Sequence, residues 1–165
     1  MFATFPIFGI TQGFLPIAGF NYGAKNWPRV RKIINTSILY SSILATLVFI
    51  LIFIFSDFIP AIFSKDLEVS KQTPAALRYV FFALPIIGIQ LIGAAYFQAI
   101  GKALPALLLT LSRQGLFFIP LLFILPSYFG VIGVWIAFPL ADLFSTIITV
   151  YFLNRAIRKE LILKH

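Results

Sequence analysis

The apolar and polar positions divide the chain into long apolar runs separated by short polar or charged segments. Five such runs can be followed, at about residues 2–20, 33–56, 79–101, 103–125 and 130–153. The second and third runs contain no charged residue, and a helix of their length is about 35 Å long. That length crosses a hydrocarbon core of about 30 Å. The pattern therefore predicts five transmembrane helices in a single membrane domain, residues 1–165.

Transmembrane strands do not fit this pattern. Strands of a barrel alternate apolar and polar residues over about ten positions, whereas residues 50–55 are apolar at every position. In lipid the backbone must satisfy its own hydrogen bonds, which a helix does within one segment. We therefore expect an all-α, polytopic membrane protein. A break between the fourth and fifth helices is expected at Pro126, Ser127 and Tyr128, because proline and polar turn residues end helices.

Composition supports a lipid environment. Only 11% of the residues are charged and 61% are hydrophobic, with a mean hydropathy of +1.01, whereas soluble domains carry about 25% charged residues. We expect the lipid bilayer to be the partner of this surface. The formal net charge is +8, but the basic residues cluster between the apolar runs and at the C-terminus. That placement is typical of membrane topology and does not indicate nucleic acid binding.

The charges between the runs predict an orientation. Residues 25–32 include four basic residues and no acid, the third connection holds Lys102, and the tail after residue 153 is mainly basic. The second connection, residues 57–78, holds three charges of each sign. Lysine and arginine prefer the cytoplasmic side. We expect a multi-pass protein of the inner cell membrane, with the C-terminus in the cytoplasm and the N-terminus of this chain outside.

Two charged residues fall inside predicted spans. Arg113 lies about 16 Å along a helix that begins at Lys102, and Asp142 lies about 18 Å along one that begins at Gly130. Because adjacent spans are antiparallel, the two charges reach a similar depth. Three interpretations remain open: a structural ion pair, a titrating or cation-coupling carboxylate at Asp142, or an Arg113 side chain that extends to the cytoplasmic surface without a partner.

The third span carries amides on one face. Gln90, Ala94 and Gln98 are spaced by four residues and so share a side of the helix. Small residues such as Gly88 and Gly93 lie nearby and permit close helix contact. The face is either a packing seam or the polar lining of a substrate cavity.

The first span is interrupted by glycine and proline. Gln12 and Asn21 are its polar candidates for a substrate or cation path, and Gly13, Pro16 and Gly19 are candidate hinges. Transporters bend or unwind such helices at ligand sites. Glycine and proline are also more frequent in membrane helices in general, so a hinge and ordinary background remain alternatives.

The sequence offers no constellation for catalysis. It has no cysteine, its single histidine is the last residue, and it lacks a Ser/His/Asp set, a phosphate loop and a metal-spaced cluster. We expect neither an enzyme nor a metal site, and no cofactor.

Three stretches together resemble the multidrug and toxic compound extrusion (MATE) transporters. QGFLPIAGFNYGAKNWPRVRK, residues 12–32, is similar to the junction that opens the second helix of their C-terminal lobe. Residues 97–126, FQAIGKALPALLLTLSRQGLFFIPLLFILP, resemble a turn and helix of the same lobe. Residues 130–145, GVIGVWIAFPLADLFS, resemble the start of its last helix. The resemblance covers nearly the whole chain.

The resemblance implies a fold and a function. Such proteins have twelve helices in two lobes, and the five spans would match helices eight to twelve, most of one six-helix lobe. The family exports small cationic, amphipathic compounds in exchange for Na⁺ or H⁺. The N-terminal lobe, on the same gene product or a separate chain, would be the missing partner. The chain is therefore expected to be the C-terminal part of a multidrug antiporter, and to be inactive alone.

One departure qualifies this expectation. The stretch that matches the tenth helix, residues 79–101, has no acid, so the carboxylate cation site of some family members is not expected there. Two alternative functions stay open: a flippase for lipid-linked sugars from the same superfamily, and a non-transporting membrane remnant.

Overall fold

The computed structural model describes residues 4–63 and 67–162, and within these ranges the ordered elements are all helical. The all-α prediction is confirmed. In chain order the helices are α1 (Phe5–Gly23), α2 (Trp27–Phe55), α3 (Ile59–Phe63), α4 (Leu67–Val80), the 3-10 helix η2 (Leu84–Ile86), α5 (Ile87–Ala99), α6 (Ala103–Leu111), the π-helix η3 (Ser112–Phe118), α7 (Ile119–Ala156) and the π-helix η4 (Ile157–Ile162).

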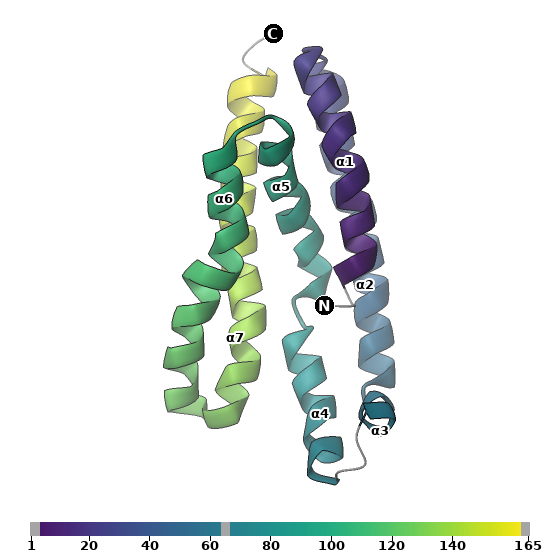
Figure 1. Ribbon diagram of the computed structural model, residues 1–165, viewed down its shortest axis with the longest axis vertical. Helices are drawn as coiled ribbons and strands as arrows, with labels where there is room; N and C mark the ends of the chain where they lie inside the picture. The colour runs from purple at the N-terminus through teal and green to yellow at the C-terminus, as the bar shows by residue number, and fades with distance from the viewer. Residues whose placement is uncertain (1–3, 64–66, 163–165) are drawn as a thin grey trace.

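The chain runs back and forth along the long axis of the molecule (Figure 1). Helix α1 leads to a tight turn, α2 returns, and α4 and α5 run back again. Residues from α6 to α7 then form a helical hairpin, Ala103–Ala156, which we call the hairpin. Helix α5 lies at the centre, because it packs against α1, α2, α6 and α7.

The turn between α1 and α2 is built by its own residues. Lys25 adopts a positive φ of 56°, which reverses the chain within three residues. Asn26 then caps α2, since its side chain accepts a hydrogen bond from the backbone N–H of Arg29 at 3.3 Å. Pro28 follows in the first turn of α2, where its missing N–H is tolerated. The basic segment 25–32 is thus a short turn and the first turns of a helix.

The hairpin reverses at Gly130, which differs from the predicted break. Pro126, Ser127 and Tyr128 remain helical, whereas Gly130 has φ 57° and ψ −139°, a conformation open essentially to glycine alone. The returning half of the hairpin passes so close to the first that a Cβ on Gly133 would overlap the carbonyl group of Leu125. Glycine geometry, and not the proline, therefore determines where the fourth span ends.

The segment predicted as an outer loop, residues 57–78, is largely helical. It contains α3 and most of α4, and α4 packs against α7. Arg78 on α4 pairs with Asp57 at 2.9 Å and donates from Nε to the Ser56 hydroxyl at 3.0 Å. The third span is correspondingly interrupted around Pro85, between α4 and α5. The charges of this segment favoured a loop, because an amphipathic helix with balanced charge has no long apolar run.

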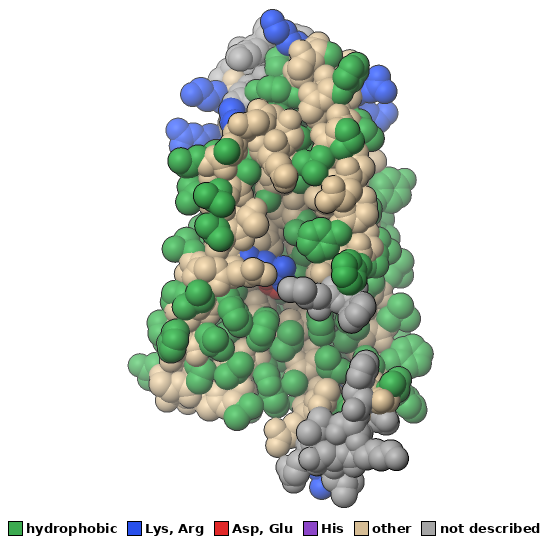
Figure 2. All heavy atoms as spheres, in the orientation of Figure 1, with side chains coloured by type: hydrophobic (Ala, Val, Ile, Leu, Met, Phe, Trp, Pro, Cys, Tyr) green, Lys and Arg blue, Asp and Glu red, His purple; other side chains and the backbone are tan. Residues whose placement is uncertain are grey.

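Among the residues that the structure describes, three helical stretches are long and apolar enough to cross a membrane by length and composition: Trp27–Phe55, Lys71–Ala99 and Ala103–Lys159. The last folds back on itself at Gly130. Large apolar side chains also cover the outside of the molecule (Figure 2), including Phe20, Phe123 and Tyr128, each more than three-quarters exposed. Such a surface is suited to lipid.

Helix α5 meets its neighbours through glycine. A Cβ on Gly88 would lie 2.9 Å from both the Cβ of Ser41 and the backbone N of Ser42 on α2, and a Cβ on Gly93 would overlap the side chain of Thr149 on α7. Larger residues at these positions would push the helices apart. Close packing of α5 against α2 and α7 is therefore found at Gly88 and Gly93, and not at the Gln90, Ala94 and Gln98 positions for which a seam was considered.

Candidate functional site

Arg113 and Asp142 form an ion pair within the hairpin. Arg113 lies on η3 and Asp142 on α7, and the Arg113 Nε donates to Asp142 Oδ1 at 2.5 Å. The Asp142 side chain is 5% exposed and that of Arg113 29%. The pairing that the sequence left open is thus present. Burying an unpaired charge costs free energy, and each residue of the pair lowers that cost for the other.

Hydroxyl groups extend this polar contact along the same two helices. Ser112 and Ser145 are joined by a hydrogen bond of 2.7 Å between their buried hydroxyls. Thr146 donates to the carbonyl of Asp142 at 2.7 Å, and Thr149 to that of Ser145 at 2.8 Å. Sequence reasoning missed this set. The signal was available, since Ser112 adjoins Arg113 and Ser145 lies three residues after Asp142 on the same helix face.

The local helix geometry changes where Arg113 lies. Residues Ser112–Phe118 form a π-helix, a wide turn that is uncommon and frequent at functional sites. It presents Arg113 and the neighbouring Gln114 to the same space. Gln114 was not predicted, although its position directly after Arg113 in the SRQ sequence could have indicated it.

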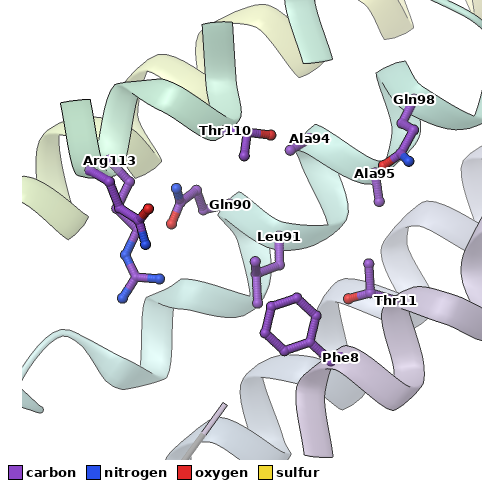
Figure 3. A pocket seen from close by; sticks show the side chains of 10 residues that line it. Phe8, Thr11, Gln90, Leu91, Ala94, Ala95, Gln98, Thr110 and Arg113 are labelled. Atoms are coloured by element: carbon purple, nitrogen blue, oxygen red, sulfur yellow. The ribbon is translucent and has the colours of Figure 1, made fainter. Parts of the chain in front are cut away.

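Three adjoining pockets share Arg113 and Gln114. The first, of about 230 Å³, lies between α1, α5 and the α6–η3 segment (Figure 3). The second, of about 240 Å³, is bounded by Asp142, Phe118 and Phe138. The third, of about 360 Å³, extends toward Phe5 and Leu84. Together they form one partly polar hollow beside the ion pair, which we call the central hollow.

Gln90 is the most enclosed polar residue of the first pocket. The residue is 3% exposed, and its Oε1 has no hydrogen-bond partner within the described part of the chain. Gln98, two turns along α5, also lines the pocket but is exposed. Both amides predicted to lie on one face of the third span are therefore found in the same pocket.

The remaining predicted residues lie elsewhere. Asn21 is buried near the end of α1 and donates from Nδ2 to the carbonyl of Ile17 at 2.7 Å. Gln12 is exposed and is not among the residues that line the central hollow. The structure therefore brings together Gln90, Gln98, Arg113 and Asp142, and separates Gln12 and Asn21 from them.

The candidate hinges lie within a continuous helix. Helix α1 passes through Gly13, Pro16 and Gly19 without interruption. Gly13 faces open space, whereas a Cβ on Gly19 would lie 3.0 Å from the carbonyl oxygen of Ala99 on α5. In this conformation Gly19 permits close packing between α1 and the end of α5. Within residues 4–63 and 67–162, no group of three His, Cys, Asp or Glu is arranged to hold a metal ion.

Comparison with known proteins gives a consistent result. The MatE family model matches residues 1–124. The multidrug export protein MepA of Staphylococcus aureus (strain MSSA476) is 26% identical over 128 residues, which are 78% of this chain and 28% of MepA. The chain thus spans less than a third of the length of this relative.

Solved structures share the fold. The structure of the MATE multidrug transporter DinF-BH in complex with rhodamine 6G matches with a TM-score of 0.88 and 39% identity, over 95% of this chain and 35% of that one. The inward-facing conformation of a multidrug resistance MATE family transporter matches with a TM-score of 0.91 and 21% identity, over 96% of this chain and 37% of that one.

Proposed function

This chain belongs to the MATE family of membrane transporters, and from that premise we propose that it forms part of an antiporter for cationic, amphipathic compounds. The exported compound would be exchanged for Na⁺ or H⁺. The proposed path passes through the central hollow, with Gln90, Gln98, Arg113 and Asp142 along it.

The observation that carries the proposal is the buried carboxylate beside a hollow with apolar walls. Asp142 lines two of the three pockets, and Phe118 and Phe138 lie beside it in the second. An aromatic wall suits the apolar part of an amphipathic cation, since ring faces attract positive charge. The Asp142 carboxylate is negative and so attracts the positive charge of such a ligand. The DinF-BH relative, whose structure contains rhodamine 6G, supports the choice of this substrate class.

We further propose that transport needs helices beyond those of this chain. The chain matches 35% of the DinF-BH chain and 28% of MepA. The pockets of the central hollow are open to the surroundings, and polar groups at membrane depth must be covered by protein or line a water-filled cavity. The complementary lobe of the family would provide that cover, on the same polypeptide or on a separate one.

The proposed orientation places the basic end of the molecule in the cytoplasm of the cell. The α1–α2 turn, the α5–α6 turn and η4 lie at the same end (Figure 1), and basic side chains gather there (Figure 2). Exposed members of this group are Lys25, Arg29, Arg31, Lys32, Arg155, Arg158 and Lys159. Cytoplasmic enrichment of lysine and arginine supports this placement in an inner membrane.

Efflux of rhodamine 6G from cells that lack their main drug pumps tests the proposal. The arms are the chain alone, the chain co-expressed with the complementary helices of DinF-BH, and those helices alone. We expect efflux only when both parts are present. The Na⁺ and H⁺ gradients are then collapsed one at a time, and the gradient whose collapse abolishes efflux identifies the coupling ion. Robust efflux by the chain alone would contradict the requirement for further helices.

A matched pair of variants tests the role of the carboxylate. Asp142→Asn should abolish gradient-driven efflux, whereas Asp57→Asn, the same substitution at a surface ion pair whose carboxylate is 63% exposed, should leave it unchanged. Membrane protein levels are measured for both by immunoblot. Equal efflux by the two variants at equal levels would remove Asp142 from the transport path.

A further inference from the structure

An unpartnered acceptor in the first pocket points to the kind of ligand that the pocket selects. Gln90 is only 3% exposed, and its Oε1 is one of the buried oxygens without a hydrogen-bond partner in the described residues. The others are Ser41 Oγ and Tyr96 OH. Only Gln90 among these three lines the first pocket. Buried polar groups in proteins are nearly always paired, so this oxygen calls for a donor.

No other polar residue of this lining, Gln98 and Gln114 included, donates to that oxygen in the described part of the chain. The hydroxyl of Thr11 donates to the carbonyl of Ile7 at 3.0 Å, and that of Thr110 donates to the carbonyl of Ala106 at 2.8 Å. Arg113 directs its Nε toward Asp142. In Figure 3 the Gln90 side chain extends from α5 toward the side where Arg113 lies, into the space that the lining residues enclose.

The surroundings also indicate what the donor is attached to. Phe8, Leu91 and Ala94 give the pocket an apolar wall, which suits a planar or greasy molecule and not a hydrated ion. A bare metal cation is disfavoured, because such ions take six or more oxygen ligands and the pocket offers one unpaired amide oxygen. An organic ligand with an N–H group satisfies both the wall and the oxygen.

We propose that Gln90 Oε1 accepts a hydrogen bond from an N–H group of the ligand, so that the first pocket selects amphipathic cations that carry an N–H over equally shaped cations that are fully alkylated. This rests on the proposed function and deepens it from cationic compounds to N–H-bearing cations. A fully alkylated cation leaves the oxygen unpaired, which sites built to hydrogen-bond their ligand discriminate against.

The test compares two probes that differ by one donor: the acridine orange cation, whose ring nitrogen carries an N–H, and its 10-methyl derivative, which carries the same charge and has no N–H. Binding to the purified chain in lipid nanodiscs is measured by fluorescence anisotropy. We expect the N–H probe to bind roughly tenfold more tightly, the size of one hydrogen bond to a charged donor.

Variants locate the preference. Gln90→Leu should bring the two affinities to within about twofold by weakening only the N–H probe, whereas Asn35→Leu, at an exposed amide on α2, should keep the wild-type ratio. The comparison of the two probes on the wild-type chain stands even where Gln90→Leu fails to fold. Equal wild-type affinities would overturn this inference, with water as the partner of Gln90, and would leave the proposed function intact. Failure of both probes to bind would overturn this inference, whereas the proposed function is contradicted only if rhodamine 6G efflux is also absent with the complementary helices present.

Discussion

The helices on the two sides of α5 are packed with different kinds of residue. On one side, α1, α2 and α5 bury large apolar residues around glycine contacts: Phe14, Val30, Ile34, Ile92 and Tyr96 are all at most 2% exposed. On the other side, the buried residues of α7 before Leu153 are small or polar. They are Gly133, Ala137, Ala141, Asp142, Ser145, Thr146 and Thr149.

The difference is instructive because lipid gives helices little hydrophobic reason to associate. Close packing and hydrogen bonds between helices remain as the main attractive forces. Both sides contain close glycine contacts, at Gly88 against α2 and at Gly133 within the hairpin. The hairpin adds the Arg113–Asp142 and Ser112–Ser145 contacts. The hollow lies next to the hairpin, so the polar contacts both hold the helices together and provide chemistry for a ligand.

Removing the arginine should have the largest effect. Arg113→Met leaves the carboxylate of Asp142 unpaired in a buried site, and we expect a loss of about 3 kcal/mol in the free energy of unfolding. Asp142→Leu should cost less, because the Arg113 side chain is 29% exposed and can extend toward the surface. The double variant should recover most of the loss. Unfolding in mixed detergent micelles, followed by circular dichroism, measures all three.

An equal cost for the two single variants, with no recovery in the double variant, would show that the ion pair does not stabilise the hairpin.

A glycine replacement on the other side of α5 should rank second. Gly88→Val places a Cβ 2.9 Å from the backbone N of Ser42, and overpacking of this kind costs about 2 kcal/mol. Gly9→Val is the matched control, because a Cβ added at Gly9 would meet no atom of another helix within 4 Å. It should change the free energy of unfolding by less than about 1 kcal/mol. The same unfolding measurement compares them. If the control is as destabilising as Gly88→Val, helix propensity and not helix contact explains the result.

The hydroxyl pair should give the smallest effect. Ser112→Ala and Ser145→Ala remove the two ends of one hydrogen bond, and we expect a coupling energy of about 0.6 kcal/mol from the double-mutant cycle, as is usual for such bonds in membranes. Ser127→Ala, at an exposed serine that bonds within its own turn, paired with Ser145→Ala should show no coupling. A zero coupling for Ser112 with Ser145 would leave the ion pair as the main polar contact of the hairpin.

The sequence predicted the parts of this fold that depend on hydropathy and helical spacing over many residues. Apolar runs gave the helices, and helical rise placed Arg113 and Asp142 at matching depth, which the structure shows as a pair. The shared face of Gln90 and Gln98 followed from their spacing. The number of membrane crossings stays a prediction.

Local geometry escaped the same reasoning. The reversal at Gly130 depends on one backbone conformation and not on the neighbouring Pro126. Helix α4 was not predicted because its charges interrupt the apolar pattern. The π-helix that presents Gln114 cannot be distinguished from an α-helix by hydropathy. The unpaired oxygen of Gln90 could be found only once its neighbours were placed.

The central claim is that the hollow beside Arg113 and Asp142 binds an organic cation. The chain has no cysteine, so a single introduced thiol reports on one site. Gln114→Cys places that thiol on the lining shared by all three pockets, and Leu104→Cys places one on the exposed side of α6. The rate of maleimide labelling in nanodiscs is measured with and without acridine orange. We predict that the probe slows labelling at position 114 severalfold and leaves position 104 unchanged; equal rates with and without probe at position 114, at concentrations where the probe binds, would contradict the account.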